Sequence, residues 1–195
     1  GPSTAFGRDF TSEGELSESA TLTVSTNINT PQDMDVVAAQ GSSENEYDNL
    51  SVLKVDFKAE KDDVTITDLV VDLTRGGAGV ATATTAYLYD GSTLIGSAAV
   101  VGTSATVMGA TFSDIDYVVS KDATKTLTVS LDIDSAGTAA DTFVADIDTA
   151  DVTSENAAGT GLTESGSATG ETITIRKIGI EATLVSKSIT KSATS

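Results

Sequence analysis

Four aspartates carry the most suggestive chemistry in the sequence, because they recur at the spacing of a β-strand. Asp132 and Asp134 alternate with apolar residues, so both carboxylates point to one face of an extended strand. If residues 142–149 return antiparallel beside them, Asp146 and Asp148 project from that same face. Clustered carboxylate oxygens are the hard ligands that Ca²⁺ prefers. The spacing therefore predicts a candidate calcium site at Asp132, Asp134, Asp146 and Asp148.

A comparison with the EF-hand calcium loop leaves a plainer interpretation open. The stretch that starts at Asp132 begins like such a loop, but Ala136 occupies its third acidic position and Phe143 its closing glutamate position. The same aspartates also fit ordinary solvent-facing positions on strands, where charged side chains are normally found. Both interpretations remain open on the sequence alone.

The residue inventory argues against an enzyme. Histidine and cysteine are absent, which removes the commonest general base, the thiol nucleophile and the soft ligands of zinc. Paired carboxylates can cleave glycosides, but tryptophan, a common platform for sugars, is also absent. The glycine-rich run at 76–79 lacks the lysine of a phosphate-binding loop and predicts only a flexible loop. We therefore expect no catalytic residues, and calcium as the only candidate cofactor.

Tyr87 and Tyr89 are candidates for a contact surface. They share one face of a predicted strand, opposite Ala86 and Leu88. Tyrosine combines a large apolar ring with a polar tip and is common at interfaces. Ordinary packing within a hairpin is the alternative interpretation.

The charge of the chain limits its partners. The formal net charge is −18 over 195 residues, and neither residues 9–53 nor residues 126–175 contain a lysine or arginine. Such a chain repels nucleic acid instead of releasing its counterions, and it also repels anionic lipid surfaces. No run of about 20 apolar residues predicts membrane insertion.

The strands that must position these residues follow from the apolar pattern. In residues 53–60, four apolar side chains alternate with four charged ones, which predicts a strand with one buried face and one wet face. In residues 63–73 the apolar phase slips near Thr67, which predicts a β-bulge or a strand that crosses between sheets. Asp90-Gly91-Ser92 predicts a hairpin turn between strands at 84–89 and 93–98. Further strands are expected at 105–112, 115–119, 125–134, 142–149 and 171–185.

Strands at this spacing, without helices between them, are typical of an all-β protein. We expect an immunoglobulin-like antiparallel two-sheet sandwich of about nine strands, with a closed barrel as the alternative. The segment Thr-Leu-Thr-Val-Ser occurs at residues 21–25 and again at 126–130. Because residues 158–165 do not repeat the strand at 53–60, the echo predicts two strands of one domain and not two domains.

The expected division of the chain has three parts. Residues 1–19 are predicted to be a tag-cleavage scar, at Gly1-Pro2, followed by a linker. Residues 20–178 form the predicted sandwich module. Residues 179–195 are predicted to hold the final strand or the start of a following module, and a tail.

Several segments in order resemble a family of extracellular modules. They are TLTVSTNINTP, VLKVDFKAEKDDVTITDLVVDL, AYLYDGSTLIGSA and ATFSDIDYVVSKDATKTLTVSLDID. Together they resemble repeated immunoglobulin-like β-sandwich modules of bacterial cell-surface and surface-layer-like proteins, over about residues 20–136. The resemblance implies an extracellular location at the cell surface, a structural or adhesive role and assembly with calcium. It supplies no catalytic residues.

The expected function is therefore a structural or adhesive module of a long cell-surface protein. Its expected partners are neighbouring modules of the same or identical chains, and cell-surface glycan or protein. The alternative is a ligand-binding module whose loops recognise glycan or protein. Neither interpretation involves nucleic acid or direct insertion into a membrane.

Overall fold

The computed structural model describes residues 19–39, 43–102 and 107–179. These residues form thirteen β-strands and one short 3₁₀ turn, η1 (Thr149–Asp151). No described helix is long or apolar enough to cross a membrane. The strands are β1 (Thr21–Thr26), β2 (Met34–Val37), β3 (Tyr47–Glu60), β4 (Val64–Gly77), β5 (Thr82–Asp90), β6 (Thr93–Ala99), β7 (Val107–Phe112), β8 (Tyr117–Val119), β9 (Thr124–Asp134), β10 (Asp141–Ile147), β11 (Val152–Asn156), β12 (Ser165–Thr169) and β13 (Ile173–Arg176).

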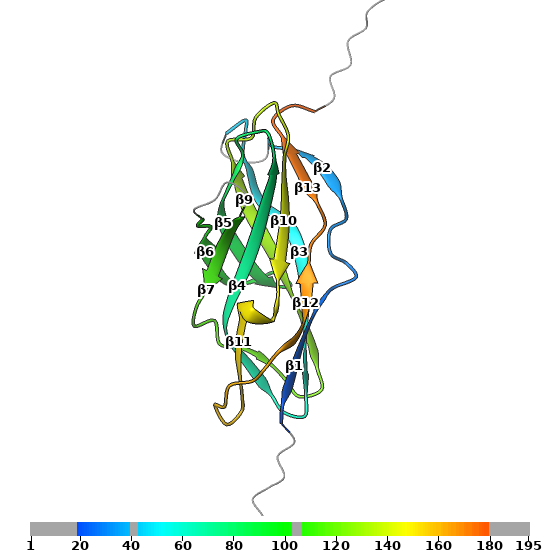
Figure 1. Ribbon diagram of the computed structural model, residues 1–195, viewed down its shortest axis with the longest axis vertical. Helices are drawn as coiled ribbons and strands as arrows, with labels where there is room; N and C mark the ends of the chain where they lie inside the picture. The colour runs from blue at the N-terminus through cyan, green and yellow to red at the C-terminus, as the bar shows by residue number, and fades with distance from the viewer. Residues whose placement is uncertain (1–18, 40–42, 103–106, 180–195) are drawn as a thin grey trace, which may run out of the picture.

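The strands form two layers joined by one strand (Figure 1). We call the layer with the order β1-β3-β9-β5-β6 sheet A. Sheet B is built around β4, which pairs with β10 and β11 along one edge and with β7 and β8 along the other. Strand β13 extends sheet B beyond β10, and β2 pairs with β13. The expected all-β, two-sheet sandwich class is confirmed.

The core lies between the sheets and follows the apolar alternation. In β3 the side chains of Leu53, Val55, Phe57 and Ala59 are completely buried. Their neighbours in sequence carry charges and face outward, as the pattern predicts for a half-buried strand. Full burial of such an apolar side chain contributes about 1.5–3 kcal/mol. The sequence pattern of residues 53–60 therefore fixes which face of sheet A is wet.

The phase slip in β4 is a β-bulge. The pairing of β11 with β4 shifts register so that Ser154 lies opposite Ile66 and Thr153 opposite Asp68. Thr67 is the extra residue on β4, and it lets apolar side chains on both sides of the slip point inward. The predicted β-bulge is confirmed.

The repeated Thr-Leu-Thr-Val-Ser segments lie on either side of one strand. Strands β1 and β9 both pair antiparallel with β3. Leu22 and Val24 of β1 are buried, as are Leu127 and Val129 of β9. The echo therefore marks two strands of one sheet, as predicted, although Ile28 lies beyond β1 and is 92% exposed.

Three strands were not expected from the sequence, namely β2, β11 and β12. Two pairings are parallel, β1 with β12 and β2 with β13, so the sandwich is not wholly antiparallel. Residues 165–167 of β12 pair with β1, whereas Ala168 and Thr169 pair with β10. Strand β12 thus crosses from sheet A to sheet B. Its sequence, SGSAT, lacks the apolar alternation that identifies a strand.

The glycine-rich run at 76–79 is anchored, contrary to the predicted flexible loop. Gly77 ends β4 opposite Asp141, whose side chain is completely buried. Asp141 accepts a hydrogen bond from the Ala81 N–H at 2.8 Å and pairs with the Arg75 guanidinium at 2.8 Å. Arg75 also donates to the Gly79 carbonyl at 2.6 Å. These contacts hold both ends of the loop. Because glycine has no side chain, it leaves room for the buried carboxylate.

The described chain runs along the long axis of the molecule. It enters at one end before β1 and leaves at the opposite end after β13 (Figure 1). Strand β13 confirms part of the strand predicted at 171–185. Most of the predicted leader and tail, residues 1–18 and 180–195, lies outside the described residues, so the three-part division stays a prediction.

Candidate functional site

The four aspartates predicted to bind calcium are divided between the two sheets. Asp132 and Asp134 lie on β9, in sheet A. Asp146 lies on β10 and Asp148 directly after it, in sheet B. Strand β10 pairs with β4, β12 and β13 and not with β9. The prediction that residues 142–149 lie antiparallel beside β9, which would gather the four carboxylates, is therefore wrong. The outer faces of opposing sheets point away from each other.

Asp132 serves as a hydrogen-bond acceptor on the outer face of sheet A. It accepts from the Tyr87 hydroxyl at 2.6 Å and from the Asn49 N–H at 2.8 Å. The hydrogen bond to Asp132 is the largest cause that raises the pKa of Tyr87. Burial raises the pKa of Asp134, and the negative charges of Glu46, Asp132 and Asp48 raise it further.

Asp146 and Asp148 also have local structural roles. Asp146 accepts a hydrogen bond from the Thr169 hydroxyl and lies directly opposite Asp72 of β4. Asp148 caps η1 by accepting from the Ala150 N–H at 2.6 Å, and its own N–H donates to Asp151 at 2.8 Å. Together these contacts form a capping box.

The positions of the four aspartates favour the plainer interpretation, solvent-facing strand positions, over a calcium site. Within residues 19–39, 43–102 and 107–179, no group of three or more acidic side chains is arranged to hold a metal ion. Because the four aspartates are divided, we expect Ca²⁺ and Mg²⁺ at equal ionic strength to shift the melting temperature equally, through charge screening alone. Thermal melts with each ion and with chelator measure this. A rise specific to Ca²⁺ contradicts it, since specific binding raises stability by mass action.

The pH dependence of stability should report the crowding of acids near η1. Burial raises the pKa of Asp151, and Asp148, Asp72 and Asp146 add to the rise, whereas the hydrogen bond from the Asp148 N–H opposes it. The folded state therefore binds this proton more tightly than the unfolded chain. Ionised Asp151 destabilises the fold at neutral pH. The lost stability is regained as the pH falls through the raised pKa of Asp151 and the carboxylate is protonated.

Asp151→Asn keeps an acceptor for the Asp148 N–H and removes the charge. We expect this variant to be more stable than the wild type at pH 7 by roughly 0.5 kcal/mol or less, because the site is partly exposed. The advantage should vanish as the pH falls toward about 4. Urea denaturation at low salt over this range measures it, with Asp114→Asn as the control. If the stability advantage of Asp151→Asn instead grows as the pH falls, the pKa of Asp151 is not raised in the folded state.

The outer face of sheet A carries the two tyrosines singled out in the sequence. Tyr87 lies opposite Ser130 and Tyr89 opposite Thr128, so the four side chains form two adjacent rows across β5 and β9. We call this surface the tyrosine face. The two rings lie 6.3 Å apart, between their centroids, at an angle of 33°. The hydrogen bond from the Tyr87 hydroxyl to Asp132 restrains the first of these two rings.

A hollow of about 340 Å³ lies within the tyrosine face. Its lining residues come from β3, β5, β9 and the turn after β5, and they are Asn49, Tyr89, Gly91, Ser92, Thr128 and Ser130. None of the six carries a charge. Gly91 has φ +60°, which fits the hairpin turn predicted at Asp90-Gly91-Ser92, and the pairing of Asp90 with Thr93 leaves a loop of two residues.

Contacts from both sheets, Tyr117 of β8 and Lys125 of β9, hold this turn in place. The Tyr117 hydroxyl donates to Asp90 at 2.9 Å, and Lys125 lies 3.8 Å from the same carboxylate. The Lys125 ammonium also lies 4.8 Å from the centre of the Tyr117 ring, within the range of a cation–π contact. Burial and the bond to Asp90 raise the pKa of Tyr117. The hollow beside Gly91 is thus supported by both sheets.

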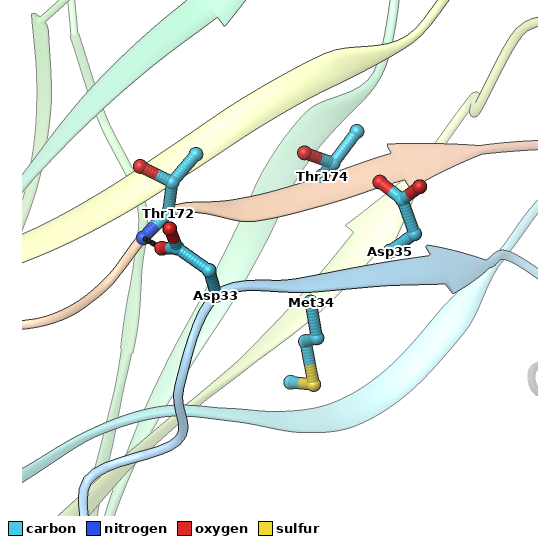
Figure 2. A pocket seen from close by; sticks show the side chains of 5 residues that line it. All are labelled: Asp33, Met34, Asp35, Thr172 and Thr174. Carbon is cyan, nitrogen blue, oxygen red and sulfur yellow. Dashed lines mark hydrogen bonds between the residues drawn. The ribbon is translucent and has the colours of Figure 1, made fainter.

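A second hollow, of about 350 Å³, lies where β2 and β13 pair (Figure 2). Figure 2 shows Asp33, Asp35, Thr172 and Thr174 on one side of the two strands, with Met34 on the other. Asp33 accepts from the Thr172 N–H at 2.8 Å, and Asp35 lies 3.3 Å from the Arg176 guanidinium. Because both carboxylates in this hollow already have partners, the hollow between β2 and β13 is the weaker candidate for ligand binding.

The tyrosine face is therefore the better candidate site. The sequence identified its aromatic residues through their shared parity. It could not identify the hollow, because Asn49 and Ser130 reach it only through the pairing of β3, β9 and β5. An uncharged concave surface with one aromatic wall and several hydroxyls is suited to binding and carries no group for catalysis.

Comparisons with known proteins add little to this picture. The sequence matches no known protein family and no curated protein. Among solved structures, it is similar to one chain of a crystal structure of a dockerin–cohesin complex, with 12% sequence identity and a TM-score of 0.35. The alignment covers 80% of this chain and 99% of that chain. So low a similarity carries no argument about function.

Proposed function

We propose that this chain is a structural or adhesive module of an extracellular cell-surface protein of the surface-layer type, and that it makes its adhesive contacts through the tyrosine face. The observation that carries the proposal is the pair Tyr87 and Tyr89, the first hydrogen-bonded to Asp132, beside an uncharged hollow on an otherwise acidic molecule. Aromatic side chains held in one rotamer contribute contact area at little cost in entropy.

The architecture supports the structural part of the proposal. A single apolar cluster spans both sheets, and β12 joins them. The chain enters and leaves at opposite ends of the long axis, so modules of this shape can follow one another end to end (Figure 1). Its partners in this role are neighbouring modules of the same or identical chains. The net charge of −18 keeps nucleic acid from being a partner.

The proposal assigns no catalytic role and no insertion into a membrane. The absence of histidine and cysteine from the sequence supports a binding role over a hydrolytic one. Calcium has no part in the proposed contact surface, because the hollow is lined by uncharged side chains.

Binding to isolated cell envelopes of the source organism tests the proposal. We expect the double variant Tyr87→Ala/Tyr89→Ala to bind at least about tenfold more weakly than the wild type, as loss of an aromatic hot spot does. The matched control is Thr74→Ala/Val118→Ala, which truncates two exposed side chains of sheet B. Equal binding by the wild type and both variants would remove the tyrosine face from the proposal.

A further inference from the structure

The hollow beside Tyr89 is lined by a serine that is almost completely buried. Ser130 is only 4% exposed, and it lines the hollow. Opposite it in register lies Ser51, whose hydroxyl oxygen is buried and lacks a partner within the described part of the chain. A buried hydroxyl without a hydrogen bond is unfavourable and is rare in folded proteins. Ser130 itself lines the hollow, so a ligand placed there can form a hydrogen bond with its hydroxyl.

The other walls supply a flat apolar surface and further hydrogen-bonding groups. Tyr89 contributes its ring to one side of the hollow. The backbone N–H of Asn49 is held by Asp132, and Asn49 is an exposed residue that lines the hollow. An amide offers both donors and an acceptor, and the hydroxyls of Thr128 and Ser92 offer one of each.

We propose that this hollow binds one neutral hexose unit of a cell-surface glycan. The inference rests on the proposed adhesive function and names the ligand class. A hexose ring presents C–H bonds on its faces, which can lie against the Tyr89 ring, and hydroxyls at its rim for Ser130, Thr128 and Asn49. Tyr89 thereby provides the aromatic platform for which the sequence has no tryptophan.

Size and charge select this ligand class. The volume of about 340 Å³ is near the lower limit of small-molecule sites, roughly 300–1,000 Å³. That is room for one sugar ring and not for a folded segment of protein. No lysine or arginine lines the hollow, and Asp132 and Asp134 lie on the same strand as Ser130 and Thr128. Sugars with carboxylate or sulfate groups are disfavoured by this negative surrounding.

Ligand-observed saturation-transfer NMR on the full chain tests the inference. The probes are glucose, galactose and mannose and linear oligosaccharides of each, with glucuronic acid as the charged comparison. We expect signal transfer from at least one neutral hexose series, with a dissociation constant of about 1 mM as befits a ligand with so few atoms. Glucuronic acid should give none.

Matched variants locate the binding. Tyr89→Ala should weaken it at least about tenfold and Ser130→Ala about threefold to tenfold, whereas Ser97→Ala on the neighbouring strand β6 should leave it unchanged. Ser130→Ala removes a single hydroxyl from the lining of the hollow, so the fold, followed by thermal melting, should persist.

Two results of the NMR experiment would overturn the inference. One is an absence of transfer from every neutral probe, and the other is transfer that Tyr89→Ala leaves intact. Envelope binding that depends on the tyrosines and survives both glycan removal and hexose competition would overturn it while sustaining the adhesive function. Envelope binding that is indifferent to Tyr87 and Tyr89 would remove the proposed function itself.

Discussion

Asp141→Ala should destabilise the protein by about 3–5 kcal/mol, the loss typical of a buried ion pair broken from one side. Asp141 is completely buried, and its partner Arg75 is only 16% exposed along the side chain. Removing the carboxylate leaves the guanidinium without its charged partner and the Ala81 N–H without an acceptor. In a domain of this length, that loss lowers the melting temperature by roughly 6–20 °C.

A double-mutant cycle separates the ion pair from its surroundings. Asp141→Asn retains the shape of the side chain, and Arg75→Met removes the partner charge. Because the two groups are in contact, the double variant should lose less than the sum of the single losses, by about 1 kcal/mol or more. Arg176→Ala is the control. Its ion pair with Asp35 is exposed and should contribute about 0–1 kcal/mol.

The outcome distinguishes two descriptions of the loop at 76–79. If Asp141→Ala matches the small loss of Arg176→Ala in urea denaturation, the buried pair does not anchor the loop. A large loss with strong coupling means that sheet B depends on this carboxylate to hold the end of β4 beside β10.

Gly166→Ala should also be strongly destabilising, by about 2–4 kcal/mol. Gly166 has φ +84°, where a side chain costs about 1–2 kcal/mol. A Cβ atom there would lie 2.1 Å from the Val24 carbonyl oxygen, so β12 must also move away from β1. This is the strand that crosses between the sheets, and the displacement therefore disturbs both.

Gly91→Ala is the matched control for this effect. Gly91 also has positive φ, at +60°, but a Cβ atom there would meet nothing within 4 Å. It should therefore cost only the backbone term, about 1 kcal/mol. Equal losses for the two variants in urea denaturation would mean that the close approach of β12 to β1 has no energetic consequence.

The layers of the fold could be predicted because the apolar residues follow the strand period. Residues 53–60 alternate strictly, and their four apolar side chains are completely buried. The phase slip at Thr67 was visible for the same reason. Strand β12 was missed because its small residues pack backbone against backbone, which leaves no apolar pattern in the sequence.

The candidate sites could be predicted only where they depend on local parity. Tyr87 and Tyr89 share a face because they are two residues apart on one strand. The proposed grouping of Asp132 with Asp146 required β9 and β10 to pair, and strand pairing depends on the whole topology. The burial of Ser130 beside the hollow likewise arises from three strands that are distant in sequence.

The most direct test of the account is an NMR titration of the isotope-labelled chain with solubilised envelope material. We expect the amide shifts to concentrate on the tyrosine face and beside it, at Asn49, Tyr87, Tyr89 and Ser130 and in the turn at Gly91. The amides on the outer face of sheet B, at Thr74 and Val118, should stay unchanged. Shifts confined to sheet B or to the groove between β2 and β13 would contradict the assignment of the tyrosine face as the contact surface.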